Sequence, residues 1–433
     1  MAQELFFRHA LLPSGWAAGV RITHAGGLIT AIETGAEPTS DCHQIALPGM
    51  PNLHSHTFQR AIAGLTEIRG DTADSFWTWR EQMYRFALRL DPDEIEAVAT
   101  QAFIEMLEGG FTSVAEFHYL HHSPDGSPYA DIAELAVRIA AAAATAGIDL
   151  TLLPVFYAHS GFGGAPPAPE QRRFINDLDR YQHILARCET LAPTGIAPHS
   201  LRAVTPVQLA ALIDLARGRP IHIHIAEQTA EVTDCLAWSG MKPAEWLLRH
   251  APVGPNWCLI HATQTDAGEL AAIAAAGAAI GLCPITEANL GDGIFPAFEY
   301  PGAFGIGTDS NVQISVAEEL RMLEYSQRLR ARARNVMASP DTRATAAALY
   351  QNAAAGGSQA LATAGGLKVG TPANIVSITG ETPDAALAQR VFCGRALVDT
   401  VWVRGIPRVS NGRHPLRDQA SRRFQAAIRN CTH

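Results

Sequence analysis

The stretch Ile45-Ala46-Leu47-Pro48-Gly49-Met50-Pro51-Asn52-Leu53-His54-Ser55-His56 joins an apolar run to two histidines spaced two residues apart. In an extended chain, residues i and i+2 project from the same side, so both imidazoles face one way. Two imidazoles a few ångströms apart can bind one metal ion. A single His-x-His motif by itself is weak evidence for a metal site. The pattern predicts a strand that ends in a pair of metal ligands.

Polar residues close three later apolar runs in the same manner. The pair His222-Ile223-His224 lies in the run 220–226, with Glu227 directly after it. His261 ends the run 257–261, and Asp309 follows the run 304–307. Active side chains at the carboxyl ends of successive strands are typical of a TIM-type barrel.

Eight short apolar runs, separated by stretches with helical patterns, lie between residues 45 and 309. Nearly continuous apolar runs suit parallel strands that are buried on both faces, and their alternation with helices suggests βα units. We therefore predict a (β/α)8 barrel. An open doubly wound sheet lacks support, since the chain has no GxGxxG motif or phosphate-binding loop. The runs are 45–53, 113–117, 150–156, 195–198, 220–226, 257–261, 279–283 and 304–307.

Both ends of the chain have the pattern of antiparallel strands. Residues 20–23 and 28–32 flank Gly26-Gly27 as in a hairpin, and residues 375–378 and 400–403 also have strand character. Neither end can bury a β-face alone, so we expect the two to pair into a small β-sandwich domain. The predicted division is 1–48 with 366–433 for the small β-domain and 49–365 for the catalytic barrel.

Composition narrows the class of protein and its partners. The 433 residues are 47% hydrophobic and 17% charged, which is ordinary for a globular enzyme. The net charge of −9 argues against a nucleic-acid partner. The longest apolar stretch, 270–284, is too short for a membrane span. Scattered cysteines without CxxC spacing and an N-terminus without a signal-peptide pattern predict a cytoplasmic location.

The segment between His56 and Asp91 is about 34 residues long, far beyond an ordinary βα loop. It carries Gln59, Trp79 and Arg80 on the face where we expect the site. Such a segment suggests a lid or a substrate-binding region. Packing against a neighbouring subunit is an equally good interpretation, and both can hold.

The predicted metal ligands are imidazoles and a carboxylate, which suit Zn²⁺ or a similar divalent ion. In the second pair we favour His224, because Glu227 follows it three positions later, as for a ligand at the strand end and a carboxylate in the following turn. His222 is expected one layer deeper. A further cluster is expected not to bind the metal: His118, His121 and His122. The predicted ligand set is His54, His56, His224 and Asp309.

With Pro48-Gly49 before the first pair and Thr308-Asp309-Ser310 at the last strand, these residues resemble the amidohydrolase superfamily, in its mononuclear deaminase branch. No lysine ends the runs 150–156 or 195–198 to be carbamylated between two metals, which favours one metal per chain. Asn374 stands where the superfamily often has Asp, but this position is far from the predicted site.

Longer motifs resemble one family of this branch, the formimidoylglutamate deiminases, over essentially the whole chain. Such enzymes hydrolyse N-formimino-L-glutamate to N-formyl-L-glutamate and ammonia in histidine degradation, and the resemblance also implies a homodimer. The motifs are MPNLHSHTFQRA at 50–61, SFWTWR at 75–80, APHSLRA at 197–203 and TEANLGDG at 286–293.

The resemblance implies roles for the remaining polar residues. Asp309 and His261 would take a proton from a metal-activated water and steady the tetrahedral intermediate. Glu227 would hold the formimino nitrogen and protonate the leaving ammonia. The two substrate carboxylates need cationic partners, and guanidinium groups match carboxylates bidentately. The substrate-binding residues so implied are Gln59, Arg80, Tyr119, His199 and Arg202.

Alternatives stay open at this point. Arg80 could form a surface ion pair, and Tyr119 and His199 could be ordinary residues of the barrel rim. Another mononuclear deaminase, acting on a heterocycle such as guanine or on an S-adenosyl compound, would use the same metal set. A non-enzymatic scaffold is disfavoured, because the ligands and Glu227 are all intact.

Overall fold

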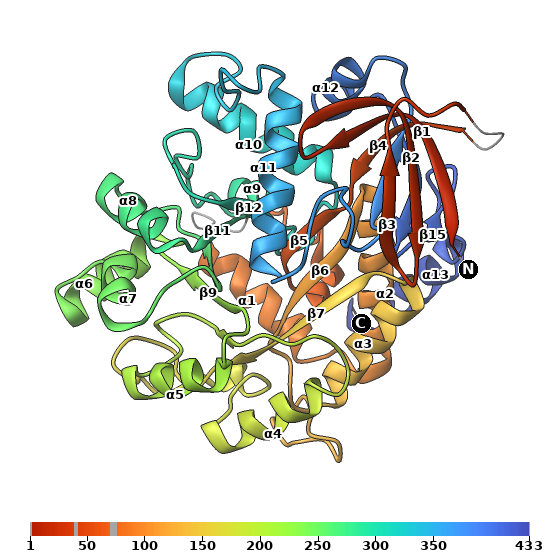
Figure 1. The fold of residues 1–433 in the computed structure, drawn as a ribbon. Helices are drawn as coiled ribbons and strands as arrows, with labels where there is room; N and C mark the ends of the chain where they lie inside the picture. Colours follow the sequence, from red (N-terminus) through yellow and green to blue (C-terminus); the bar gives the residue numbers. More distant parts are fainter. Residues whose placement is uncertain (1, 39–41, 70–75, 433) are drawn as a thin grey trace.

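The structure is a computed structural model that describes residues 2–38, 42–69 and 76–432 (Figure 1). Its centre is a barrel made of two four-stranded parallel sheets. Bridges between Ser200 and His224 and between Ser55 and Asp309 close the barrel at both seams. The predicted (β/α)8 fold is confirmed. The strands are β5 (Met50–Ser55), β6 (Phe111–His118), β7 (Asp149–Phe156), β8 (Ala197–Pro198), β9 (Ile221–Ile225), β10 (Trp257–His261), β11 (Ala279–Leu282) and β12 (Phe304–Ile306).

The first predicted run, 45–53, is two strands, which corrects the sequence interpretation. β4 (Cys42–Pro48) belongs to a second sheet, and β5 begins at Met50 after the single residue Gly49. A Cβ atom on Gly49 would lie 2.2 Å from Oγ1 of Thr112. The chain can therefore pass from one sheet to the other at this point only because residue 49 has no side chain.

Helices follow the barrel strands and surround them in Figure 1. α2 (Pro92–Gly109) begins with a capping box between Asp91 and Glu94 and ends at Gly110, which has a φ of 101°. Thr205 and Asp266 begin two further helices with capping boxes of the same kind. The helices that follow α2 around the barrel are α3 (Glu134–Ala146), α4 (Leu178–Cys188), α5 (Pro206–Ala216), α6 (Thr229–Ser239), α7 (Pro243–His250), α8 (Ala267–Ala276), α9 (Pro284–Leu290), α10 (Val316–Ala331) and α11 (Thr345–Ala360).

Both chain ends build one seven-stranded sheet, in the order β15-β14-β13-β4-β1-β2-β3. β4 joins the two ends because it pairs with β1 on one side and with β13 on the other. The predicted sandwich is thus one continuous sheet (Figure 1). Phe7, Val20 and Trp402 belong to the hydrophobic core of this sheet. Its other strands are β1 (Gln3–Leu12), β2 (Gly15–Ala25), β3 (Leu28–Glu33), β13 (Ile375–Ile378), β14 (Val398–Val403) and β15 (Ile406–Val409).

The C-terminal region also carries two helices, α12 (Pro383–Cys393) and α13 (Arg417–Thr432). α13 packs on α2 of the barrel, so the C-terminal part contacts both the sheet and the barrel. The division into 1–48 with 366–433 and 49–365 stays a proposal.

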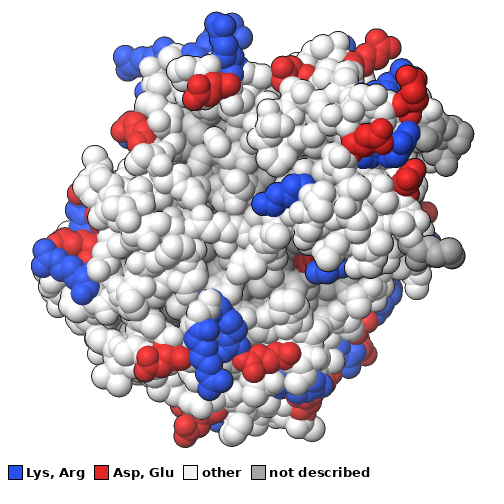
Figure 2. Space-filling model, viewed as in Figure 1, with Lys and Arg blue, Asp and Glu red and all other residues white. Residues whose placement is uncertain are grey.

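The long segment after His56 contains the 3-10 helix η1 (Thr57–Ile62) and α1 (Phe76–Ala87). Ser75, at the start of one family motif, lies outside the described residues. On the face shown in Figure 2, basic and acidic side chains are interspersed over a largely uncharged surface. Among the described helices, none has both the length and the apolar character that crossing a membrane requires.

Candidate active site

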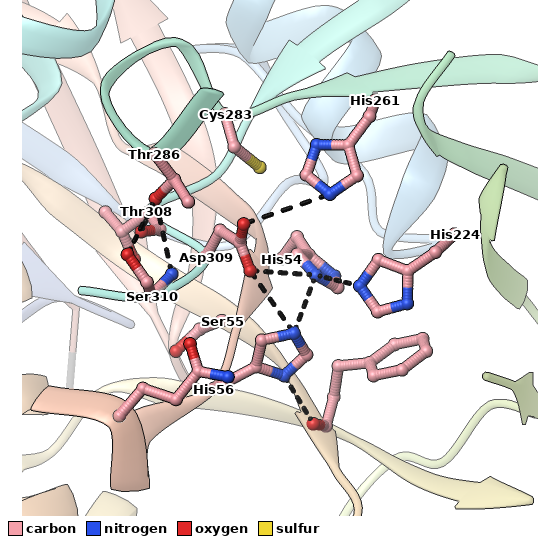
Figure 3. Close-up of polar contacts among 12 residues, drawn as sticks. His54, Ser55, His56, His224, His261, Cys283, Thr286, Thr308, Asp309 and Ser310 are labelled. Atoms are coloured by element: carbon pink, nitrogen blue, oxygen red, sulfur yellow. Dashed lines mark hydrogen bonds and ion pairs between the residues drawn. The ribbon is translucent and has the colours of Figure 1, made fainter. Parts of the chain in front are cut away.

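Three imidazoles and one carboxylate meet at the carboxyl end of the barrel (Figure 3). The Nε2 atom of His54 lies 3.1 Å from Nε2 of His56 and 3.0 Å from Nε2 of His224. The Oδ1 atom of Asp309 lies 3.4 Å from Nε2 of His54 and 3.2 Å from Nε2 of His56. All four residues are buried. The structure therefore brings together the four predicted ligands from β5, β9 and the turn after β12.

A hydrogen bond through Nδ1 sets the orientation of two of these imidazole rings. Nδ1 of His56 donates to the carbonyl oxygen of Phe117, and Nδ1 of His224 donates to that of His199, each at 2.9 Å. A carbonyl only accepts, so in the neutral ring the proton is on Nδ1 and Nε2 keeps its lone pair. Burial and the neighbouring His56 lower the pKa of His54 to about 3. Three imidazole nitrogens and a carboxylate oxygen that converge on one point form a donor set that a divalent cation satisfies, so the group fits a divalent metal.

The carboxylate beside these rings stays ionised. Burial acts to raise the pKa of Asp309, but the contacts with His54 and His56 outweigh it and hold the pKa well below its usual value. Oδ1 of Asp309 faces the histidines, and Oδ2 lies 3.8 Å from Nε2 of His261. Asp309 can therefore serve the metal with one oxygen and a reacting water with the other.

The other histidines of the sequence patterns have different partners. Nε2 of His222 lies 2.8 Å from the carbonyl oxygen of Ala360, at the end of α11. Nε2 of His121 bonds to the carbonyl of Val155, and Nε2 of His122 bonds to that of Ile175. None of these atoms belongs to the converging group formed within the described residues.

His261 and Glu227 lie next to the four ligands. Nε2 of His261 is 3.9 Å from Glu227, and its Nδ1 is 3.2 Å from Oε1 of Glu287 on α9. Burial lowers the pKa of His261, but Glu227, Glu287 and Asp309 outweigh it and raise the pKa to about 10. Burial raises the pKa of Glu227, and His261 only partly offsets this rise. The site thus pairs a protonated imidazole with a carboxyl group that can carry a proton.

Backbone conformations at the strand ends help to aim these side chains. Ala226, His261 and Asp309 have φ values of 48°, 69° and 47°, in the left-handed region that residues other than glycine seldom occupy. Each lies just after or at the end of β9, β10 or β12. Such strain persists where the surrounding structure imposes it, and it is concentrated at functional sites.

The predicted substrate residues line one pocket above the ligands. Nε2 of Gln59 donates to the hydroxyl of Tyr119 at 2.7 Å, and the ring of His199 lies 4.8 Å from that of His224. Arg202 is buried, while Arg80 on α1 is partly exposed, with its guanidinium 5.6 Å from the ring of Tyr84. The pocket-lining residues predicted from sequence are His56, Gln59, Arg80, Tyr119, His199, Arg202, His224, Glu227, His261 and Asp309.

Several residues of this region were not singled out from the sequence, among them Glu287, Tyr157 and Tyr84. Glu287 contacts Nδ1 of His261. It lies in the family motif at 286–293, which was the signal that could have identified it. Tyr157 directly follows β7 and lines the pocket. The strand-end rule that selected His261 would also have selected Tyr157.

Comparison with known proteins places the chain in a family. The model of the "Amidohydrolase family" matches residues 45–407, and that of "Formimidoylglutamate deiminase HutF, N-terminal domain" matches residues 4–43. The formimidoylglutamate deiminase of Pseudomonas aeruginosa is 49% identical, with 97% of each chain covered.

More distant and structural relatives agree with this placement. The 8-oxoguanine deaminase of the same bacterium is 26% identical, with 72% of each chain covered. The crystal structure of an amidohydrolase from Brucella melitensis is 53% identical, covers 100% of both chains and superposes with a TM-score of 0.97. The chain belongs to the amidohydrolase family and, within it, to the formimidoylglutamate deiminases.

Proposed function

We propose that the protein hydrolyses N-formimino-L-glutamate to N-formyl-L-glutamate and ammonia, with one Zn²⁺ or similar divalent ion per chain. The observation that supports this most is a single pocket that joins the His–Asp group and Glu227 to Arg80 and Arg202. The name of the 49% identical Pseudomonas aeruginosa relative agrees with it. The proposal places the reacting amidine at one end of the pocket and the diacid at the other.

His54, His56, His224 and Asp309 would hold the ion. A divalent ion bound by such a set supplies an activated water at neutral pH. The Oδ2 atom of Asp309, turned toward His261, is placed to accept the proton of that water. His261, with its raised pKa, keeps a proton and would steady the negative charge that develops as the water oxygen adds to the formimino carbon.

Glu227 would complete the reaction by moving protons to nitrogen. Burial raises its pKa, which favours the protonated form that a proton donor needs. It would donate its own proton to the formimino nitrogen as the water oxygen adds, and would then move the proton of the added hydroxyl group to the same nitrogen. The C–N bond would break, ammonia would leave as the C=O bond of the formyl group forms, and the proton held by Asp309 would restore Glu227. Glu287, which bonds Nδ1 of His261, would hold that imidazole toward Glu227 and Asp309.

The diacid end of the substrate requires two cationic partners. Moving a carboxylate into a partly desolvated pocket costs much free energy unless a cationic group pairs with it. Arg202 is buried near Tyr157 and His199, and Arg80 on α1 lines the same pocket. Each would bind one carboxylate. Gln59, Tyr119 and His199 would fill the pocket between the arginines and the metal group.

Further parts of the proposal concern the cellular setting. We propose a cytoplasmic homodimer that acts in histidine degradation, with no nucleic-acid or membrane partner. The mixed charges on the face in Figure 2 agree with the absence of a nucleic-acid partner.

The decisive experiment is ammonia release from N-formimino-L-glutamate compared with guanine, 8-oxoguanine and cytosine under the same conditions. We expect turnover of the formimino diacid and little turnover of the heterocycles. Preferential turnover of a heterocycle would instead assign the protein to another deaminase of the same branch.

A further inference from the structure

Two tyrosines and a glutamine form a buried network on the arginine side of the pocket. Nε2 of Gln171 donates to the hydroxyl oxygen of Tyr157 at 2.7 Å and to that of Tyr84 at 3.3 Å. Tyr157 follows β7, Tyr84 lies on α1, and Gln171 ends the 3-10 helix η2 (Pro169–Gln171). The three side chains come from separate parts of the chain and are all buried.

The amide of Gln171 has a defined orientation. Its Oε1 accepts from the backbone N–H of Ala168 at 2.8 Å, so Nε2 is the atom that faces the tyrosines. An NH₂ group only donates, and both phenol oxygens therefore act as acceptors toward Gln171. These bonds occupy lone pairs of the phenol oxygens and leave the hydroxyl protons for an acceptor such as a ligand.

The network lies beside the groups that would bind carboxylates. Tyr84, Tyr157, Arg80 and Arg202 all line the pocket, whereas Gln171 is behind the tyrosines. The ring of Tyr157 lies 4.5 Å from that of His199. Burial raises the pKa of Tyr157, so its phenol stays protonated at neutral pH.

We infer that the Tyr84–Tyr157 hydroxyl pair, oriented by Gln171, donates a hydrogen bond to a substrate carboxylate held by Arg80 or Arg202. The inference rests on the proposed function and extends it. A carboxylate offers about four acceptor positions, and one guanidinium fills two of them. A fixed neutral donor fills a third and favours an oxyanion over a neutral group, since a hydroxyl aimed at an apolar group would stay unpaired. Tyr84 and Tyr157 are thus specificity residues, and Gln171 is a positioning residue.

The test uses Tyr84→Phe, Tyr157→Phe and the double variant. Tyr181→Phe is the matched control, because its buried hydroxyl donates to the carbonyl of Pro154 at 3.0 Å and lies outside the pocket lining. Two quantities are measured: kcat/KM for N-formimino-L-glutamate, and the Kd of N-formyl-L-glutamate by calorimetry, which does not depend on turnover. The double variant should lose about 10- to 100-fold in both, mostly through binding, because a hydrogen bond to a charged group is lost. Gln171→Leu should weaken diacid binding while kcat changes little.

The outcomes separate this inference from the proposed function. Parent-like diacid binding by the double variant would overturn the inference and leave the proposed function intact. Equal losses in Tyr181→Phe would also overturn it, since the effect would then be structural. A parent protein that neither binds N-formyl-L-glutamate nor turns over the formimino diacid would overturn the proposed function itself, and this inference with it.

Discussion

At the residue scale, the direction of each histidine decides its chemistry. His222 and His224 are two residues apart on β9, yet Nε2 of one faces a backbone carbonyl and Nε2 of the other faces the ligand group. We predict that His224→Asn loses the metal, whereas the matched variant His222→Asn retains about one divalent ion per chain. Elemental analysis of both proteins, purified side by side, checks this. Metal loss confined to His222→Asn would contradict the proposed ligand set, as would two ions per chain in the parent with activity that follows the second.

A substitution at Glu227 can distinguish metal binding from proton transfer. Glu227→Gln keeps the shape of the side chain and removes the group that carries the proton. We expect the variant to retain its metal and to lose about 10²–10⁴-fold in kcat. The control is Glu269→Gln, in which another buried carboxylate is changed at the start of α8, far from the pocket lining. A near-normal kcat in Glu227→Gln would show that Glu227 has a structural role and does not transfer the proton.

Carboxylate recognition is a third test at this scale. Arg202→Met should lower kcat/KM for the diacid by about 10²–10⁴-fold, because a buried charge pair is lost. Arg80→Met should cost less, since this side chain is partly exposed and water screens it. Arg187→Met, which removes a partly exposed ion pair with Asp131 outside the pocket lining, should change neither value.

A mono-acid formimino analogue completes this arginine test. It should be a poor substrate for the parent and little worse for the variant that lacks the matching arginine. If each variant loses equally on the diacid and on the mono-acid, the arginines do not recognise carboxylates, and a neutral heterocycle becomes the better substrate hypothesis.

At the scale of elements, close packing of α11 on β12 places a strand of the site. A Cβ atom on Gly356 of α11 would lie 1.9 Å from the carbonyl oxygen of Phe304. Helix propensity alone would favour alanine by about 1 kcal/mol. The clash is with backbone, which cannot move aside, so we predict that Gly356→Ala destabilises the protein by about 1–3 kcal/mol.

Thermal unfolding measures this effect, with Gly254→Ala as the control. A Cβ on Gly254 would have its nearest neighbour at 3.9 Å, an ordinary contact. A Gly356→Ala protein as stable as the parent would show that the helix can shift without cost.

At the scale of the whole molecule, buried neutral histidines make stability depend on pH. Burial lowers the pKa of His118 to about 3, with Arg173 adding to the effect, and burial also lowers the pKa of His121. An unfolded histidine has a pKa of about 6.5. Below that pH, the histidine binds a proton in the unfolded chain but not in the folded chain, so the free energy of unfolding decreases as pH falls. Each such histidine contributes a slope of up to about 1.4 kcal/mol per pH unit.

We predict that His121→Gln lowers this slope between pH 6 and 4. The glutamine amide can still donate to the carbonyl of Val155, which His121 contacts, and it does not titrate. Urea unfolding at several pH values, compared with the parent, measures the difference. Because His121 lies outside the proposed metal ligands, an unchanged slope would show that it is protonated in the folded protein or remains neutral in the unfolded one.

Local patterns in the sequence were sufficient to predict the barrel and the polar residues that meet at the carboxyl ends of its strands. Eight apolar runs alternate with helical patterns, and polar residues close the strands at His56, His224, His261 and Asp309. Strand periodicity and helix capping depend on residues near in sequence, so they can be found without coordinates. The motifs that resemble the family carried the interpretation from a metal site to a diacid substrate.

Tertiary packing alone decided the other features. The division of the run 45–53 at Gly49 depends on Thr112, and the direction of His222 depends on Ala360. The support of His261 by Glu287 and the bonds of Gln171 to two tyrosines also join distant segments. A side-chain direction is set by whichever group packs against it. When that group lies far along the chain, no local pattern records it, so only the folded structure shows that Tyr157 stands beside the arginines.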